Sequence, residues 1–128
     1  MPFDWRELLA LARDLAGYSG SSYSTEAASR TSVSRAYYAA FCYVRNYAES
    51  KLGFQRARKA RDHGELREHL RDLGAPWDRI GDYLEDLYKW RVLCDYEDNV
   101  QDLDLLVSQA IDTAEKIIQS VGNQVQCR

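Results

Sequence analysis

The chain carries an arginine on the apolar face of a segment, Gly81–Tyr96, whose periodicity predicts a helix. Apolar residues recur there at helical spacing, namely Ile80, Leu84, Leu87 and Cys94. Arg91 follows Leu87 by four residues and shares this stripe. A guanidinium on a core-facing stripe is costly unless it is paired or opens into a cleft. Arg91 is therefore either a structural arginine paired to a carboxylate or helix-end carbonyls, or a functional arginine at an interhelical or intersubunit cleft, aimed at a phosphate or carboxylate.

Helical patterns also cover the rest of the chain, whose 128 residues correspond to a single domain, 1–128. Only two prolines and seven glycines interrupt them, and β-branched residues are sparse, which favours helix. Helices are predicted over residues 4–16, 25–51, 62–73, 76–96 and 100–121. The third begins at a predicted capping box of Asp62 and Glu65. Five amphipathic helices with short connections predict an all-α fold, an up-and-down bundle.

The helix predicted over residues 25–51 has a second face that mixes charged and aromatic side chains. This face carries Arg35, Tyr38, Cys42, Arg45 and Glu49. Such a mixture is typical of a surface that contacts a partner rather than water. The helix around Arg91 has a similar second face, so we predict a homodimer, with Arg35 and Tyr38 as candidate binding residues.

Charge is distributed unevenly, although the net charge of −3 gives no overall attraction to nucleic acid. Basic residues outnumber acidic ones over 51–71, and acidic residues dominate over 72–106. The basic connector over 54–61 includes Arg56 and Arg58, which we take as candidate binding residues for an anion. Three interpretations stay open: an anionic partner, self-association through opposite patches, or an ordinary solvated surface.

Several classes of function find no support in the sequence. Cys42, Cys94 and Cys127 are too few and too scattered for a disulfide framework or a metal site. The sequence has neither a phosphate-cradling glycine loop nor a serine nucleophile elbow, so we expect no metal and no cofactor. The chain also starts without a hydrophobic signal region and has no apolar run of membrane length. We therefore expect a cytoplasmic protein with no membrane partner.

The residues that follow Arg91 supply the remaining candidates for chemistry. Asp95 comes four residues later, within reach of Arg91 on a continuous helix. The pair could simply stabilise the end of the helix. Alternatively, Asp95 orients the guanidinium while the hydroxyl of Tyr96 acts as a donor or weak acid. Tyr96 would be a poor general base, because an unperturbed phenol has a pKa of about 10.

Three stretches together resemble the HEPN domain (higher eukaryotes and prokaryotes nucleotide-binding). They are Ser34-Arg-Ala-Tyr-Tyr-Ala-Ala-Phe41, His63-Gly-Glu-Leu66 and Leu87-Tyr-Lys-Trp-Arg-Val-Leu-Cys-Asp-Tyr96. The resemblance covers nearly the whole chain and implies a bundle of four or five helices, commonly a homodimer with its cleft at the two-fold axis. It also implies RNA or a nucleotide as the ligand. Many members are metal-independent ribonucleases of toxin–antitoxin, defence or RNA-processing systems, and many prokaryotic members are encoded beside a minimal nucleotidyltransferase.

The sequence departs from the family's nuclease motif, which is an arginine, four to six residues, and then a histidine. Arg91 matches the arginine, but Tyr96 stands about where the histidine would fall, and no histidine follows His69. His63 could reach the cleft from the preceding helix and replace the missing base. Some members also carry an AMP-accepting tyrosine, and the corresponding residue here is Asp98, which does not support that modification.

Three functional hypotheses follow from these observations. The first is a metal-independent endoribonuclease that uses Arg91 with help from Tyr96, Asp95 or His63. The second is a non-catalytic homodimer that binds RNA, a nucleotide or a minimal nucleotidyltransferase through the same cleft. The third is a structural dimer in which Arg91 and Asp95 hold the interface. We favour a HEPN-like protein of a toxin–antitoxin or defence module that binds or acts on RNA or a nucleotide.

Overall fold

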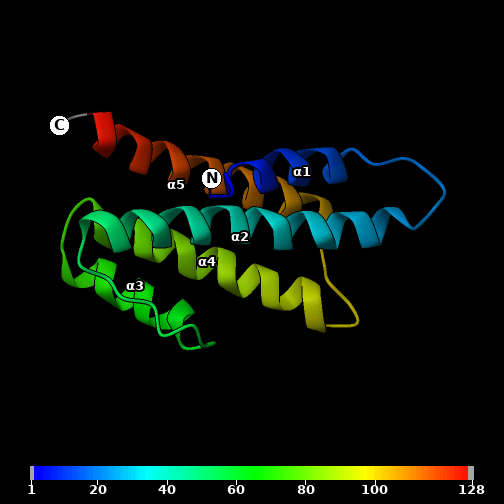
Figure 1. The fold of residues 1–128 in the computed structure, drawn as a ribbon. Helices are drawn as coiled ribbons and strands as arrows, with labels where there is room; N and C mark the ends of the chain where they lie inside the picture. The colour runs from blue at the N-terminus through cyan, green and yellow to red at the C-terminus, as the bar shows by residue number, and fades with distance from the viewer. Residues whose placement is uncertain (1, 127–128) are drawn as a thin grey trace.

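A computed structural model describes residues 2–126 and confirms the all-α prediction. Its five helices are α1 (Glu7–Ala16), α2 (Thr25–Lys51), α3 (Asp62–Asp72), α4 (Trp77–Tyr96) and α5 (Leu103–Gln126). The long helix α2 crosses the middle of the bundle, with α1 and α5 on one side and α4 on the other (Figure 1). Helix α3 packs on α4 and lies next to the connector over residues 52–61.

Helix α2 can be surrounded by three other helices because small side chains line it. Five of its alanines are buried, namely Ala28, Ala36, Ala39, Ala40 and Ala48. Small residues let neighbouring backbones approach closely, and each neighbour then contributes a stripe of larger side chains. The buried apolar side chains form one continuous core over the described residues. The side of α2 that faces α3 and α4 carries aromatic residues instead of alanines, namely Tyr37, Tyr38 and Phe41.

The ends of two helices differ from the sequence prediction. Helix α1 begins at Glu7 rather than residue 4, because Asp4 turns its carboxylate to the backbone N–H and guanidinium of Arg6. Helix α5 begins at Leu103 rather than residue 100, because Asp102 has a left-handed φ of 52° that stops the helix from extending further back. The same helix continues past residue 121 to Gln126. Cys127 lies outside the described residues.

The predicted capping box at the start of α3 is wrong. Asp62 is the first residue of α3, but its carboxylate accepts hydrogen bonds from the backbone N–H groups of Ala57, Arg58 and Lys59, at 2.8, 2.8 and 3.2 Å. Glu65 lies 3.5 Å from the guanidinium of Arg61. Asp62 therefore folds the basic connector against α3 instead of capping the helix. These backbone N–H bonds hold the pKa of Asp62 below its ordinary value.

Two further observations concern the chain as a whole. None of the helices in the described part of the chain combines the length and the apolar character needed to cross a membrane. Cys42 and Cys94 are buried free thiols, and the burial of Cys94 agrees with its position on the predicted apolar stripe.

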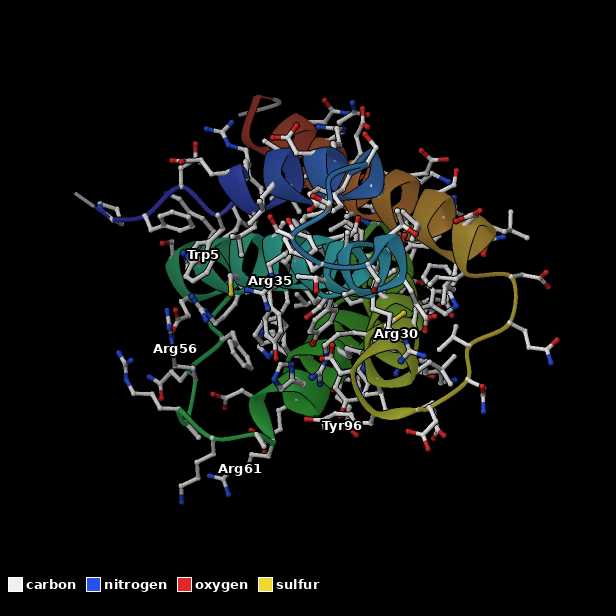
Figure 2. The ribbon with its side chains drawn as sticks, turned by 90° about the vertical axis from the view of Figure 1, so that its right-hand side faces the viewer. Trp5, Arg30, Arg35, Arg56, Arg61 and Tyr96 are labelled. Carbon is white, nitrogen blue, oxygen red and sulfur yellow. The ribbon has the colours of Figure 1, made fainter. Side chains whose placement is uncertain are left out.

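Arg30 of α2 holds the end of α4 in place (Figure 2). Its guanidinium donates to the backbone carbonyls of Cys94 at 3.0 Å, Glu97 at 2.6 Å and Asp98 at 2.9 Å. These carbonyls have no further helical turn to bond to, so a cation at this helix end is favourable. Arg30 also pairs with Glu26 on its exposed side. The clamp thereby fixes the part of α4 that contains Arg91 and Asp95.

We predict that Arg30→Met lowers the free energy of unfolding by about 2 kcal/mol, because several hydrogen bonds from a charged donor are lost together. Urea unfolding followed by circular dichroism measures this change. Glu26→Gln is the matched control, since it removes only an exposed ion pair and should cost less than about 0.5 kcal/mol. Equal losses in the two variants would contradict the clamp.

Candidate functional site

Three helices bring basic and aromatic side chains together on the α3/α4 side of α2. We call this set the arginine–aromatic cluster. It comprises Arg35, Tyr37, Tyr38, Phe41, His63, Arg67, Tyr88 and Arg91. Arg35 and the first three rings come from α2, His63 and Arg67 from α3, and Tyr88 and Arg91 from α4. Gly81 of α4 helps α3 to approach, because its Cα hydrogen faces the backbone oxygen of Arg67, where a Cβ would lie only 3.1 Å away.

Arg91 is buried, with only 9% of its surface exposed. Its guanidinium carbon lies 5.6, 5.5 and 5.2 Å from the ring centres of Tyr37, Tyr38 and Tyr88. One N–H, on Nη1, donates to Asp95 Oδ2 at 3.2 Å, while the buried Nε has no hydrogen-bond partner among the described residues. The Asp95 pair agrees with the structural interpretation of Arg91. The unused donor is left for another acceptor, since buried donors in proteins are nearly always bonded.

Arg91 remains cationic in these surroundings. Burial lowers the pKa of its guanidinium, but Tyr38 and the hydrogen bond to Asp95 outweigh that effect and leave the pKa above its ordinary value. The faces of aromatic rings attract cations, which explains how three rings can replace water around a buried guanidinium.

Two more arginines of the cluster also have buried donors without a hydrogen-bond partner in the part of the chain that the structure describes. Arg35 lies 5.3 Å from the ring centre of Tyr38 and its Nε is unbonded, while Arg67 lies 4.8 Å from the ring centre of Tyr88 and its Nη1 is unbonded. Among the described residues, the only carboxylate that pairs with any of the three guanidinium groups is Asp95. The cluster therefore has a surplus of positive charge and of N–H donors, which is suited to an anion.

His63 occupies the space between α2 and α4 within the same cluster. Its ring stacks on Phe41 at 4.4 Å, and its Nδ1 is hydrogen-bonded to the hydroxyl of Tyr37. Burial lowers the pKa of His63, and the positive charges of Arg91 and Arg67 lower it further. His63 is therefore neutral at neutral pH.

The hydrogen bond to Tyr37 also determines which nitrogen of His63 carries the proton. Burial raises the pKa of Tyr37 far above its usual range, so the phenol keeps its proton and needs an acceptor. Nδ1 of His63 is the atom that this hydroxyl contacts, so we assign the acceptor role to Nδ1 and the proton of the neutral imidazole to Nε2. In this state His63 presents a donor at Nε2, not a free base.

The other predicted site residues lie in different surroundings. Tyr96 is 73% exposed at the end of α4, so within one chain it is not placed beside the buried Arg91. Arg56 and Arg58 line a surface cavity of about 360 Å³ between α2 and the basic connector. Tyr38 and His63 line the same cavity and also belong to the cluster. The cavity and the cluster are thus continuous through these two side chains.

Sequence reasoning missed several members of the cluster. Tyr37, Phe41, Arg67 and Tyr88 are not among the site residues that the sequence predicts. Arg67 follows His63 by four residues, a spacing that places both on one face of α3 and could have indicated it. Among residues 2–126, no three His, Cys, Asp or Glu side chains gather in a way that could hold a metal ion.

The comparisons with known proteins give one result. The family model for the HEPN domain matches residues 6–124, nearly the entire chain. The chain belongs to the HEPN family. No curated protein and no solved structure matches it. HEPN domains commonly dimerise and bind nucleotides, so membership supports a role related to nucleotides or RNA in general terms.

We predict that His63 titrates below its ordinary value of 6.5. At a pH between the pKa of His63 in the folded protein and its pKa in the unfolded chain, the unfolded chain binds more protons than the folded protein. The free energy of unfolding should therefore fall as the pH drops below about 6.5. Histidine NMR titration gives the pKa, and urea unfolding between about pH 7 and pH 5.5 gives the slope, in a range where most carboxylates stay ionised. His63→Phe should show a shallower slope. A pKa at or above 6.5 would contradict the prediction.

Proposed function

We propose that this HEPN protein binds RNA or a nucleotide through the arginine–aromatic cluster. The observation that carries the proposal is Arg91, a buried guanidinium whose Nε has no hydrogen-bond partner within residues 2–126 and which shares aromatic rings with two more arginines that have unused donors. These donor atoms are buried, so the side chains must shift to let a phosphate oxygen accept from them and compensate the local positive charge. Guanidinium groups suit phosphate well, because their planar N–H donors can bond two oxygens at once.

The aromatic members of the cluster favour a nucleotide over a simple anion. Tyr38 and Tyr88 are only partly buried, and each ring also contacts a guanidinium. Single-stranded nucleic acids are commonly bound by a combination of basic side chains and aromatic rings on which bases stack. His63 Nε2–H adds one more donor at the cavity. In this arrangement the arginines bind phosphate and the half-buried tyrosines contact the base.

We also propose that the protein works as a homodimer in which Arg91 lies near a shared cleft. Leu93 and Tyr96 of α4 are exposed, at 42% and 73%, which supports a contact surface on this helix. In a dimer, Tyr96 and Asp95 of the partner could reach the cleft that Tyr96 does not reach within one chain. A cytoplasmic toxin–antitoxin or defence module, with a minimal nucleotidyltransferase as partner, remains our expectation from the family resemblance.

The binding proposal predicts that Arg91→Ala weakens binding of a fluorescent single-stranded RNA by tenfold or more, because hydrogen bonds from a charged donor are each worth roughly 1.5–3 kcal/mol. Fluorescence anisotropy measures the affinity. Arg79→Ala, on the exposed first turns of the same helix, carries the same charge change and should have little effect. Arg35→Gln and Arg67→Gln test the same surplus of donors at less buried positions, in case Arg91→Ala alters the fold. Unchanged affinity in all three cluster variants would refute the proposal.

A second candidate function is metal-independent RNA cleavage, and the position of His63 favours it. His63 and Arg91 contact the same three rings, Tyr37, Tyr38 and Tyr88, so the imidazole and the guanidinium belong to one site. To act as a base at Nε2, the imidazole would have to move its proton to Nδ1 and reverse the bond with Tyr37. That reversal leaves a buried phenol proton without an acceptor, which disfavours the step.

We therefore expect purified protein in EDTA to bind RNA without rapid cleavage. Gel analysis of several labelled RNAs measures this directly. If cleavage occurs and is lost in Arg91→Ala, His63→Ala and Tyr96→Phe identify the base, and the protein is a ribonuclease. The Arg91→Ala protein must match the wild type in helicity and oligomeric state for the comparison to count.

A further inference from the structure

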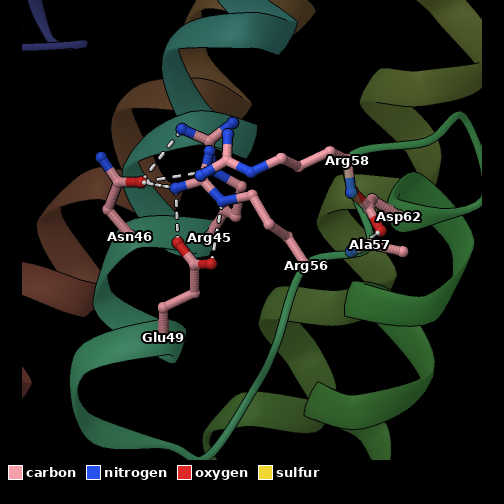
Figure 3. Close-up of polar contacts among 7 residues, drawn as sticks. All are labelled: Arg45, Asn46, Glu49, Arg56, Ala57, Arg58 and Asp62. Atoms are coloured by element: carbon pink, nitrogen blue, oxygen red, sulfur yellow. Dashed lines mark hydrogen bonds and ion pairs between the residues drawn. The ribbon is translucent and has the colours of Figure 1, made fainter.

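Three arginine side chains converge over the cavity between α2 and the basic connector. Arg45 comes from α2, and Arg56 and Arg58 come from the connector. Figure 3 shows the three side chains pointing toward one another, and all three line this cavity. We call these residues the arginine trio. Arg45 also lies over the ring of Phe41, at 5.9 Å, which is the ring on which His63 stacks.

Little negative charge balances the trio. Arg56 pairs with Glu49, with its Nε 2.8 Å from Oε2. Arg45 and Arg56 both donate to the same neutral oxygen, Oδ1 of Asn46, at 3.0–3.2 Å. The guanidinium of Arg58 has no hydrogen bond or ion pair to the other residues drawn in Figure 3, where only its backbone N–H is bonded, to Asp62. Asp62 is a second carboxylate at this cavity, but its oxygens accept hydrogen bonds from three backbone N–H groups. The cations of the trio therefore outnumber the carboxylates, and mutual repulsion opposes their convergence unless an anion lies between them.

The backbone of the connector holds Arg58 in this position. Arg58 has a φ of 63°, in the left-handed region that residues other than glycine rarely adopt. Asp62 stabilises that conformation by accepting from the N–H of Arg58 and of both of its neighbours. The backbone of Arg58 is therefore fixed at the edge of the cavity before any ligand arrives. A preordered cationic site loses less entropy when it binds.

We propose that the arginine trio binds a phosphate group, and that this phosphate belongs to the RNA strand or nucleotide that the arginine–aromatic cluster also contacts. The identity of the ligand rests on the proposed function, whereas the phosphate site rests on the trio alone. Tyr38 and His63 line the cavity and belong to the cluster, so a strand that crosses both would place one phosphate on the trio and the adjoining nucleotide on these rings. Asn46 orients two of the guanidinium groups.

The test compares Arg58→Gln with Arg61→Gln, which remove the same charge from the same connector. Arg61 is an exposed residue that projects into solvent and pairs with Glu65 (Figure 2). Arg58→Gln should weaken RNA binding roughly tenfold at about 0.1 M salt and reduce the salt slope by roughly 0.7, the value for one phosphate of a single strand. Arg61→Gln should change affinity less than about twofold. Equal effects would show general electrostatic attraction and overturn the proposal.

A second variant is expected to strengthen binding rather than weaken it, which makes the test more specific. Glu49→Gln frees Arg56 from its carboxylate, so phosphate binding should strengthen severalfold if the trio is a phosphate site. If the ion pair is only structural, Glu49→Gln leaves affinity unchanged or lowers it, which would contradict the proposal. RNA with and without a 5′-phosphate distinguishes the two sources of the group: a preference for the phosphorylated end indicates terminal phosphate, and equal affinity indicates an internal phosphodiester.

Inorganic phosphate separates this inference from the proposed function. Thermal denaturation in millimolar phosphate, against chloride of equal ionic strength, should show stabilisation of the wild type and of Arg61→Gln but not of Arg58→Gln. If phosphate stabilises the protein in this way but the protein binds no RNA, the proposed function is refuted and the phosphate site is supported. RNA binding that Arg91→Ala abolishes and Arg58→Gln does not change, with no stabilisation by phosphate, would refute the phosphate site alone.

Discussion

A guanidinium buried in the middle of α4 must be stabilised by something other than water, and much of the structure around it meets that requirement. Three tyrosine rings from two helices surround Arg91, and the carboxylate of Asp95 accepts a hydrogen bond from its guanidinium. The rings require α2 and α4 to lie side by side at this level. Asp95 requires α4 to stay helical to its end, and the clamp from Arg30 ensures it. The packing of α2 against α4 and the candidate site therefore depend on the same residue.

The distribution of charge separates this site from the rest of the molecule. The chain as a whole is acidic, with a net charge of −3, and many exposed arginines have carboxylate partners. Along one side of α2, however, cations exceed carboxylates, first around Arg91 and then around Arg58. An overall negative protein can still bind an anion in such a place, because charges within a few ångströms outweigh distant, screened ones. Tyr38 and His63 connect the two basic regions.

The fold could be predicted well because it depends on local patterns. The spacing of apolar residues predicted all five helices. The predicted ends of α2 at Lys51 and of α4 at Tyr96 agree with the structure. The site was predicted less completely. Arg91 and its bond to Asp95 follow from spacing on one helix, but the contact of Arg91 with Tyr37 and Tyr88, and the bond between Tyr37 and His63, join separate helices. Asp62 illustrates the limit, since its carboxylate had local helix N–H groups within reach and bonded the preceding connector instead.

The sequence by itself determined the helical class, the burial of Arg91 on an apolar stripe and the basic character of the connector, because each depends on residue type and spacing along one segment. Only the tertiary structure decided which cations share a site. Helix crossings placed Arg67 and His63 beside Arg91, and the fold of the connector placed Arg58 at the same cavity as Arg45. It also placed Tyr96 on the exposed end of α4, away from Arg91. The physical reason is that side-chain direction across a packed interface depends on the relative rotation of two helices, which the spacing within either one does not encode.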